Sequence, residues 1–447
     1  MAGSSSPEHP IERASQVIAQ ALDMAQAQGA SAAEATVTLA SGLSVTVRMD
    51  AIEILEHHRD KDLGVTVYLG HRKGSASTSD FGPAAIQKTV RAAFGIARYA
   101  GEDECAGLVE AELMARAIPD LDLYHPWGLT PEQAIVMARE CEGAARAKDP
   151  RIRNSEGATV SDHAGVYAYG NSHGFRGAWA GSRSSISCTV IAMEGDNMQR
   201  DHWYTLARNP DHLQAPNQVG ERAAERALRR LGARQLSTRS TAVLFEANVA
   251  SSLFAHFISA ISGSNLYRKT SFLVDHLGKR VFSERVTLEE QPHIPQAIGS
   301  APFDNDGVAT LPRTLVEKGL LRGYVLSGYS ARKLGMRPTG NAGGVHNLIV
   351  QPGSADLEGL LAHMDTGLLV TELMGFGVNL VTGDYSRGAS GFWVEHGQIQ
   401  FPVEEITIAG NLREMFLGIA AIGRDVDERS NIRTGSVLIE QMTVAGQ

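Results

Sequence analysis

The spacing of apolar residues predicts alternating helices and strands in the first part of the chain. From Pro10 to Gln28 apolar positions recur every three or four residues, which predicts an amphipathic helix that ends at Gly29. Residues 34–79 alternate between apolar and polar positions, and connections as short as theirs predict antiparallel hairpins. The turns are expected at three pairs: Ser41-Gly42, Lys61-Asp62 and Gly70-His71.

Two further helices and a second group of strands follow. Pro83–Tyr99 carries an apolar stripe, and Thr130–Lys148 reads as a helix that Thr130 caps. Residues 101–129 between them are polar, acidic and rich in proline, which predicts a linker between subdomains rather than a core segment. Residues 152–207 return to strand patterns as a second meander, and a helix near Asn217–Leu231 closes it.

A change of pattern near residue 235 predicts a domain boundary. Residues 240–263 read as a strand that runs into a helix, and most of the remainder consists of short strands with glycine turns. Asn411 is expected to begin one late helix that continues through Ala420, with Glu414 placed as in a capping box. The predicted fold class is therefore α+β. It has an N-terminal α/β domain of antiparallel sheets and flanking helices (1–235) and a C-terminal β-rich domain (236–447).

Composition and charge exclude several classes of function. The 447 residues carry a net charge of -9 without a Lys/Arg-rich run, which disfavours direct binding of nucleic acid. No apolar stretch of about 18 residues and no secretory pattern is present, so we expect a cytoplasmic protein that does not enter a membrane. The three cysteines lie far apart, which supports neither a disulfide framework nor a metal knuckle.

The sequence 371–411 is unusually rich in glycine between β-prone runs. Glycine inside strands marks bends or places where another backbone lies close. The polar group at its centre is Asp384, Tyr385, Ser386 and Arg387. One interpretation is a turn in which Asp384 caps backbone N–H groups and Arg387 pairs with a carboxylate. The other is the wall of a cleft that binds a peptide or a partner.

Three other groups of residues have side chains that could support chemistry. Ser330 and Lys333 have the S-x-x-K spacing of a serine nucleophile, and Tyr329 stands four residues before Lys333 as in dehydrogenases. The companion motifs of both enzyme classes are absent, so a surface helix is the preferred interpretation. Imidazoles and carboxylates, which suit zinc, occur close together at two places. Neither place has a further ligand at a suitable spacing in the sequence, so we expect these side chains to be solvated. They are Glu56, His57 and His58, and Glu289, Glu290 and His293.

Four long segments resemble the PmbA (TldE) branch of the TldD/PmbA family. They are residues 262–281, 328–347, 382–411 and 429–447, and the similarity extends over essentially the whole chain. The resemblance implies a cytoplasmic protein with an N-terminal α/β domain and a C-terminal β-rich domain. In the TldD branch a helix bears H-E-x-x-x-H, and a cysteine near the C-terminus completes a zinc site. Those proteins resemble peptidases that cut unfolded peptides, and the PmbA branch is their partner subunit.

The residues at the corresponding positions differ from that zinc motif. Phe254 and Ser259 stand where the resemblance places the two histidines, Ala255 where it places the glutamate, and Thr434 where it places the cysteine. His256 is the only histidine between residues 241 and 275. One imidazole cannot replace the three protein ligands that catalytic zinc requires. We therefore expect no metal in this chain, and a His256 that is hydrogen-bonded or faces a partner.

The resemblance implies a non-catalytic, metal-free partner subunit of a TldD/PmbA-type zinc metallopeptidase complex. That complex would degrade or process unfolded peptides, including precursors of peptide antibiotics, with the zinc held by a TldD-type partner. The alternative is a homodimeric binding or regulatory protein, similar to a gyrase modulator, without proteolysis of its own. A third, weaker hypothesis is an independent hydrolase built on Ser330 and Lys333. The expected contacts with peptide or partner are His256, Asp384, Tyr385, Ser386, Arg387, Gly388 and Gly391, and both glycines are expected to be required for folding or assembly.

Overall fold

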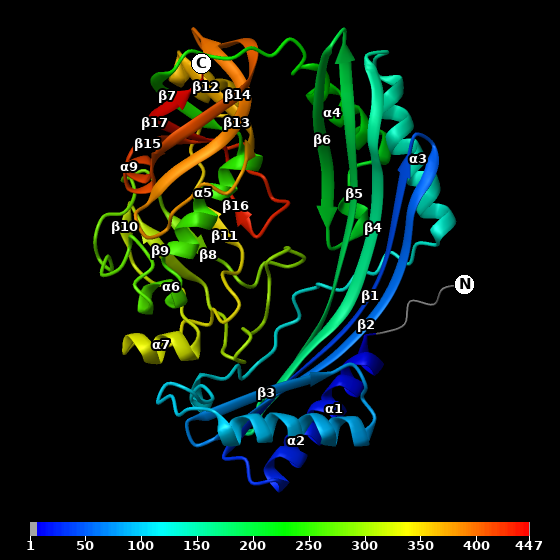
Figure 1. The fold of residues 1–447 in the computed structure, drawn as a ribbon, viewed down its shortest axis with the longest axis vertical. Coiled ribbons are helices and arrows are strands. Elements are labelled where there is room, and N and C mark those ends of the chain that lie inside the picture. The colour runs from blue at the N-terminus through cyan, green and yellow to red at the C-terminus, as the bar shows by residue number, and fades with distance from the viewer. Residues whose placement is uncertain (1–6, 447) are drawn as a thin grey trace.

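The structure is a computed structural model that describes residues 7–446, and one long antiparallel sheet forms its first half. The strand order is β3-β2-β1-β4-β5-β6. Figure 1 shows these strands curving along one side of the molecule, opposite the elements of the C-terminal half. The bounds are β1 Ala32–Arg48, β2 Ala51–Leu69, β3 Arg72–Thr78, β4 Ile152–Asn171, β5 Arg176–Glu194 and β6 Asn197–Ala207.

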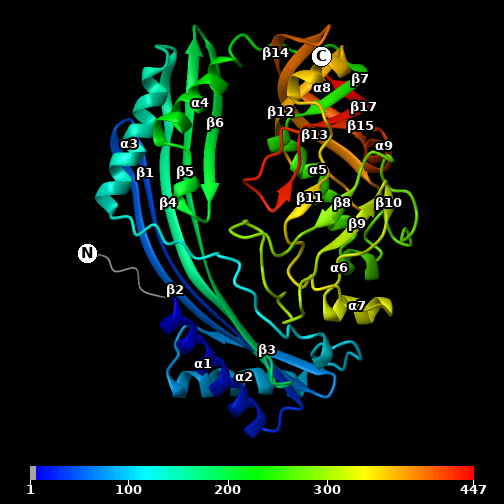
Figure 2. The ribbon, with the colours of Figure 1, turned by 180° about the vertical axis from the view of Figure 1, so that it is seen from behind.

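Four helices cover the two ends of this sheet. Helices α1 (Glu8–Ala27) and α2 (Pro83–Tyr99) pack against the end that carries β3. Helices α3 (Pro131–Ala147) and α4 (Pro216–Leu228) pack on each other and on the opposite half of the sheet, as Figure 2 shows from behind. The sequence therefore predicted all four helices, two of them from apolar periodicity, and the bounds of α2 agree with the prediction. Thr130 caps α3 in a capping box with Gln133.

Two of the three turns expected in the first meander are wrong. Strand β1 continues through Ser41-Gly42 and β2 continues through Lys61-Asp62, and the chain turns instead at Met49-Asp50, both with positive φ. Gly42 pairs with residues on β2 and on β4 at once, and these ladders hold it extended. A Cβ on Gly42 would overlap the imidazoles of His58 and His163. Gly42 therefore allows a close approach of side chains rather than a turn.

The two strand meanders belong to one sheet, and the segment between them is not a simple linker. Strands β1 and β4 pair along most of their length, which joins both meanders. Leu121 and Leu123 of the supposed linker are buried. The guanidinium of Arg332 donates hydrogen bonds to the carbonyls of Cys105, Gly107 and Leu108. The segment is thus held against both halves of the chain, which the acidic composition did not indicate.

The C-terminal half contains two further sheets. One has the order β10-β9-β8-β11-β16, and the other has the order β14-β13-β12-β7-β17-β15. Because β14 also pairs with β17, the strands β7, β12, β13, β14 and β17 form a closed ring of pairings. The bounds are β7 Arg239–Phe245, β8 Leu288–Glu290, β9 Arg313–Glu317, β10 Leu320–Leu321, β11 Leu348–Val350, β12 Gly367–Met374, β13 Asp384–Glu395, β14 Gln398–Asn411, β15 Ile419–Ile422, β16 Ile432–Arg433 and β17 Val437–Ala445.

Helix α5 lies in the main apolar core of this half. Phe254 and Phe257 are fully buried, and their rings contact Phe282 and Phe416. The late helix α9 ends earlier than expected, because Gly418 follows Leu417 and β15 begins at Ile419. The side chain of Asn411 accepts from the N–H of Arg413 instead of forming a capping box with Glu414. The helices are α5 Ala247–Ala260, α6 Gly263–Tyr267, α7 Gly328–Leu334, α8 Leu357–Met364 and α9 Leu412–Leu417.

A buried ion-pair network joins the two halves. Arg226 on α4 is 3% exposed and contacts Asp201 on β6 and Glu246 before α5, each at 3.1 Å. Arg230, one turn later, contacts Glu372 on β12 at 2.5 Å. The α+β fold class and the antiparallel N-terminal sheet are confirmed, whereas the division at residue 235 stays a prediction. Within residues 7–446, no helix is long and apolar enough to span a membrane.

We expect Arg226→Ala to lower the free energy of unfolding by about 3–5 kcal/mol, because it leaves the carboxylate of Asp201 buried without its closest cation. The control is Arg222→Ala, which removes an exposed guanidinium of the same helix and should cost less than about 1 kcal/mol. Urea unfolding of both variants measures the difference. Equal losses would contradict a special role for the buried network.

Candidate functional site

The zinc positions implied by the resemblance carry side chains that cannot bind zinc. On α5, Phe254 stacks on Phe282 in the core, and the hydroxyl of Ser259 donates to the carbonyl of Ala255 at 2.9 Å. Thr434 follows β16, which packs against α5, and its buried hydroxyl donates to the carbonyl of Gly435. Between residues 7 and 446, no group of three or more His, Cys, Asp or Glu side chains could hold a metal ion. These residues therefore do not fit the zinc ion of the TldD branch.

His256 lies beside strand β13 and its imidazole is partly buried. The ring packs edge-to-face against Tyr385, with centroids 6.2 Å apart. Nε2 is buried and has no hydrogen-bond partner among the described residues. Burial lowers the pKa of His256, and the nearby charge of Arg387 lowers it further. The imidazole is therefore neutral at neutral pH.

The polar group at 384–387 lies in a strand, so the interpretation of these residues as a turn is wrong. The residues begin β13, which pairs with β14 from Asp384 opposite Asn411 onward. Their side chains alternate, because successive residues of a strand point to opposite faces. Asp384 and Ser386 are exposed, whereas Tyr385 is 1% exposed and faces His256. Asp384 accepts hydrogen bonds from the Thr382 hydroxyl and the Asn411 amide rather than capping backbone N–H groups.

Three polar atoms without partners lie together between α5 and β13. They are His256 Nε2, the Tyr385 hydroxyl and Arg387 Nε, all buried, and we call these residues the α5–β13 cluster. Among the described residues no carboxylate forms an ion pair with Arg387, so the expected partner is not found. Burial raises the pKa of Tyr385 to about 12, although the positive charge of Arg387 opposes the shift. The cluster offers hydrogen-bond donors suited to a carbonyl or carboxylate group.

The two glycines of the predicted contact surface differ in their surroundings. A Cβ on Gly391 would overlap the carbonyl oxygen of Leu369 on the neighbouring strand β12. A Cβ on Gly388 would lie 3.4 Å from the Cβ of Met374, which is an ordinary contact. Close approach of a neighbouring backbone therefore requires glycine at position 391 but not at position 388.

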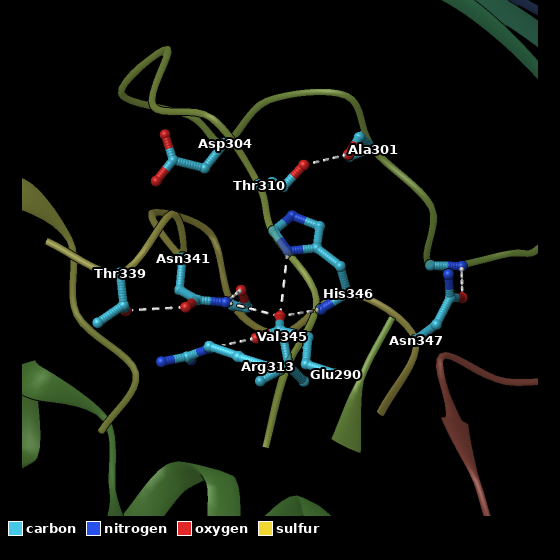
Figure 3. Close-up of polar contacts among 12 residues, drawn as sticks. Glu290, Ala301, Asp304, Thr310, Arg313, Thr339, Asn341, Val345, His346 and Asn347 are labelled. Carbon is cyan, nitrogen blue, oxygen red and sulfur yellow. Dashed lines mark hydrogen bonds and ion pairs between the residues drawn. The ribbon is translucent and has the colours of Figure 1, made fainter. Parts of the chain in front are cut away.

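A second polar cluster surrounds Glu290, which is buried rather than solvated as expected (Figure 3). One carboxylate oxygen accepts from Arg313 Nε at 2.7 Å, and the other accepts from the Asn341 amide and the backbone N–H of His346, both at 2.7 Å. Despite the desolvation that burial causes, the hydrogen bonds from His346 and the charge of Arg313 keep the pKa of Glu290 low. Strand β8 lies between β9 and β11, so the side chain points inward and fixes the loop before β11. His293 contacts the Thr310 hydroxyl and makes no hydrogen bond to Glu290 within the part of the chain that the structure describes.

Asp304 lies beside this cluster and organises the turn that follows it (Figure 3). Its carboxyl group accepts from the backbone N–H groups of Asp306, Val308 and Ala342. Burial raises the pKa of Asp304 to about 7, and the nearby charge of Asp306 adds to the shift. The role of Asp304 is structural, because all three partners are backbone groups of the surrounding loops.

Ser330 and Lys333 do not form the pair that the weaker hydrolase hypothesis requires. The hydroxyl of Ser330 is bound within the N-terminal cap of α7, where it donates to the carbonyl of Ser327 and accepts from its N–H. Lys333 instead donates to Asp103 at 2.8 Å, and Tyr329 donates to the same carboxylate at 2.7 Å. At the other candidate metal pair, His58 packs against His163 with ring centroids 5.3 Å apart, while Glu56 and His57 are exposed.

Comparisons with known proteins give one consistent family. Models of three PmbA/TldA metallopeptidase domains match the chain: domain 1 at residues 33–97, the central domain at 124–231 and the C-terminal domain at 238–446. A metalloprotease PmbA homolog of Haemophilus influenzae is 48% identical over 96% of both chains. Metalloprotease PmbA of Escherichia coli O157:H7 is 47% identical over 97% of this chain and 96% of its own.

Solved structures share the whole fold. A protein from Bacteroides thetaiotaomicron, described as a candidate modulator of DNA gyrase, is 30% identical with a TM-score of 0.92 and covers 97% of this chain and 98% of its own. TldE from Thermococcus kodakarensis is 20% identical with a TM-score of 0.86, over 96% of this chain and 100% of its own, which shows likeness of fold alone.

The surroundings of the two glycines give a matched pair of substitutions. We expect Gly391→Ala to lower the free energy of unfolding by about 3 kcal/mol or more, because the neighbouring strand must shift to admit the Cβ. Gly388→Ala should change it by less than about 1 kcal/mol. Chemical unfolding of both variants measures the effect, and similar stabilities would contradict the close approach at Gly391.

Asp304 should make stability depend on pH in a defined direction. Its pKa of about 7 lies above the ordinary value of 3.8, so the folded state binds the proton more tightly than the unfolded state. The resulting stabilisation is present at low pH and is lost as the pH rises from about 4 to about 7. In urea unfolding across this range, we expect the wild type to lose stability relative to Asp304→Asn. Parallel curves for the two proteins would show that Asp304 does not titrate in this window.

Proposed function

The chain belongs to the PmbA/TldD metallopeptidase family, and from this premise we propose that it is the non-catalytic, metal-free partner subunit of a zinc metallopeptidase complex. A TldD-type subunit would supply the zinc ion and the glutamate that activates water. This chain would supply a wall of the substrate site and contacts to the peptide. The proposed substrates are unfolded peptides, including precursors of peptide antibiotics, and the proposed compartment is the cytoplasm.

The observation that carries this proposal is the set of side chains on and beside α5. Phe254 cannot leave the core without losing its contact with Phe282, and the hydroxyls of Ser259 and Thr434 donate to backbone carbonyls. His256 is the one imidazole of the helix. A catalytic zinc ion needs three protein ligands and an open position, which these residues do not offer.

The α5–β13 cluster supports the proposed contact with peptide or partner. Arg387 is half-buried, and its Nε lies buried without an acceptor among the described residues, which is costly unless an acceptor from another molecule reaches it. A peptide carbonyl, a peptide carboxylate or an acidic side chain of the partner would satisfy Arg387 and the Tyr385 hydroxyl. Asp384 and Ser386 point to the opposite, exposed face of β13 and would meet a different part of the partner.

The alternative is a homodimeric binding or regulatory protein without proteolysis. It is favoured by the likeness of the whole fold to the Bacteroides protein described as a candidate modulator of DNA gyrase. In that case two copies of this chain would associate and a TldD-type partner would have no effect on them. The oligomeric state with and without such a partner distinguishes the two proposals.

The decisive assay measures cleavage of an unfolded peptide by this chain alone, by an H-E-x-x-x-H partner alone and by both together. We expect cleavage only with both chains, abolished by a chelator, and less than about 0.1 zinc per molecule of this chain when it is purified without a tag. Stoichiometric zinc in this chain, or hydrolysis by this chain alone, would contradict the proposal. A stable homodimer that ignores the partner would favour the alternative.

Arg387→Met should lower the activity of the mixed chains at least about tenfold while leaving the melting temperature nearly unchanged, because it removes a donor without a structural partner. The control is Arg322→Met, which removes an exposed guanidinium paired with Glu317 and should leave activity unaltered. Full activity of Arg387→Met would exclude the cluster from the contact surface.

A further inference from the structure

A cavity separate from α5 lies where the sheet meets the C-terminal half. Its volume is about 390 Å³, and its lining comes from strands β1 to β4, the segment after α2, the turn at Asp306 and helix α7. Figure 1 shows β3, the coil after α2 and α7 coming together at the lower end of the molecule. Residues far apart in the sequence therefore form one site, and Tyr329 is the one lining residue whose sequence pattern suggested chemistry.

Two carboxylates from opposite sides face this cavity. Glu34 on β1 accepts hydrogen bonds from the hydroxyls of Tyr68 at 2.8 Å and Tyr169 at 2.9 Å. Asp306, from the C-terminal half, accepts the N–H of Gly328 at 2.8 Å. Both carboxylates also line a second cavity of about 380 Å³, so they lie between two cavities. Neither forms an ion pair within the described range of the chain.

The cations nearest to these carboxylates are engaged elsewhere. Arg332 donates to three carbonyls of the segment after α2, and Lys333 pairs with Asp103. Lys73 lies over the ring of Tyr68, with its ammonium 5.9 Å from the centroid. Burial raises the pKa of both Glu34 and Asp306, and hydrogen bonds and the charge of Lys73 only partly oppose it. The lysine and arginine side chains around the cavity therefore offset only part of the cost of ionising these two carboxyl groups.

The aromatic lining adds a second and independent feature. Tyr68, Tyr169 and Tyr329 all border the cavity, and aromatic rings attract cations through their faces. Lysine ammonium groups already lie over two of these rings, since Lys73 is over Tyr68 and Lys333 is 5.3 Å from the centroid of Tyr329. Carboxylates combined with tyrosine rings and hydroxyls form a lining suited to an organic cation that also donates hydrogen bonds.

We propose that this cavity binds a primary ammonium group, held between Glu34 and Asp306 and bordered by the tyrosine rings. The group belongs either to a free alkylamine or to the N-terminus of a peptide. A primary ammonium offers three N–H donors to the carboxylates, whereas a quaternary ammonium has no N–H donor. The site lies on the isolated chain and does not depend on the proposed partner or on zinc.

The test is isothermal titration calorimetry of the full chain at about pH 8, because burial raises the pKa of both carboxyl groups and a higher pH favours their ionised form. The probes are hexylamine, hexanol of the same length, hexyltrimethylammonium and calcium ion. We expect hexylamine to bind with one site per chain, at least about tenfold more tightly than hexanol or hexyltrimethylammonium. Binding of hexanol equal to that of hexylamine, or preference for calcium or for the quaternary ion, would overturn the proposal.

Two peptide probes identify the source of the ammonium group. Trialanine amide with a free N-terminus and its acetylated form differ only in that group. Binding of the free peptide at least as tight as that of hexylamine assigns the site to peptide N-termini, and binding of hexylamine alone assigns it to free amines. Equal binding of both peptides would show that the ammonium group is not recognised.

Substitutions place the binding in this cavity. Glu34→Gln and Asp306→Asn each remove one charge, and each should weaken hexylamine at least about tenfold. Glu112→Gln, an exposed carboxylate, is the control and should leave binding unchanged. Melting temperatures identify a variant that fails to fold. In that case the relative affinities of the four probes for the wild-type chain still test the proposal. Unchanged affinity in both folded cavity variants would overturn it.

Discussion

Burial of α5 in the core of the C-terminal half limits what this protein can do. Phe254 and Phe257 are fully buried against the rings of Phe282 and Phe416. A close-packed interior does not release such side chains without a large loss of contacts. The positions at which the TldD branch would carry a ligand are therefore committed to packing and to hydrogen bonds with the backbone. The helix contributes a single imidazole, His256, to its polar side.

The closed ring of strands places β13 beside that helix and sets the orientation of its side chains. Pairing with β12 and β14 fixes the alternation, so Tyr385 and Arg387 face α5 while Asp384 and Ser386 face outward. The same pairing brings Gly391 against the carbonyl of Leu369. One strand thus combines a position that tolerates no side chain with polar atoms that have no partner. A structural requirement and the proposed contact surface lie within seven residues.

The N-terminal sheet is joined to the C-terminal half by charged and polar side chains as well as by apolar contacts. Arg226 and Arg230 connect α4 with Asp201, Glu246 and Glu372. At the other end, the guanidinium of Arg332 donates hydrogen bonds to three backbone carbonyls of the segment after α2. The cavity that contains Glu34 and Asp306 lies beside this second connection. Its two carboxylates are brought together because both halves are fixed at both ends.

The sequence by itself determined the family, the α+β class and the helices with strong apolar periodicity, since burial of one helical face requires that spacing. Pro83–Tyr99 is an example in which the prediction and the helix have the same bounds. Tertiary structure alone decided that Gly42 is extended, that 384–387 is a strand and that Glu290 is buried. In each case the deciding partners come from distant strands, such as His163 for Gly42 and Arg313 for Glu290. The orientation of a side chain depends on these contacts between distant strands. The spacing of residues along the chain carries no information about them.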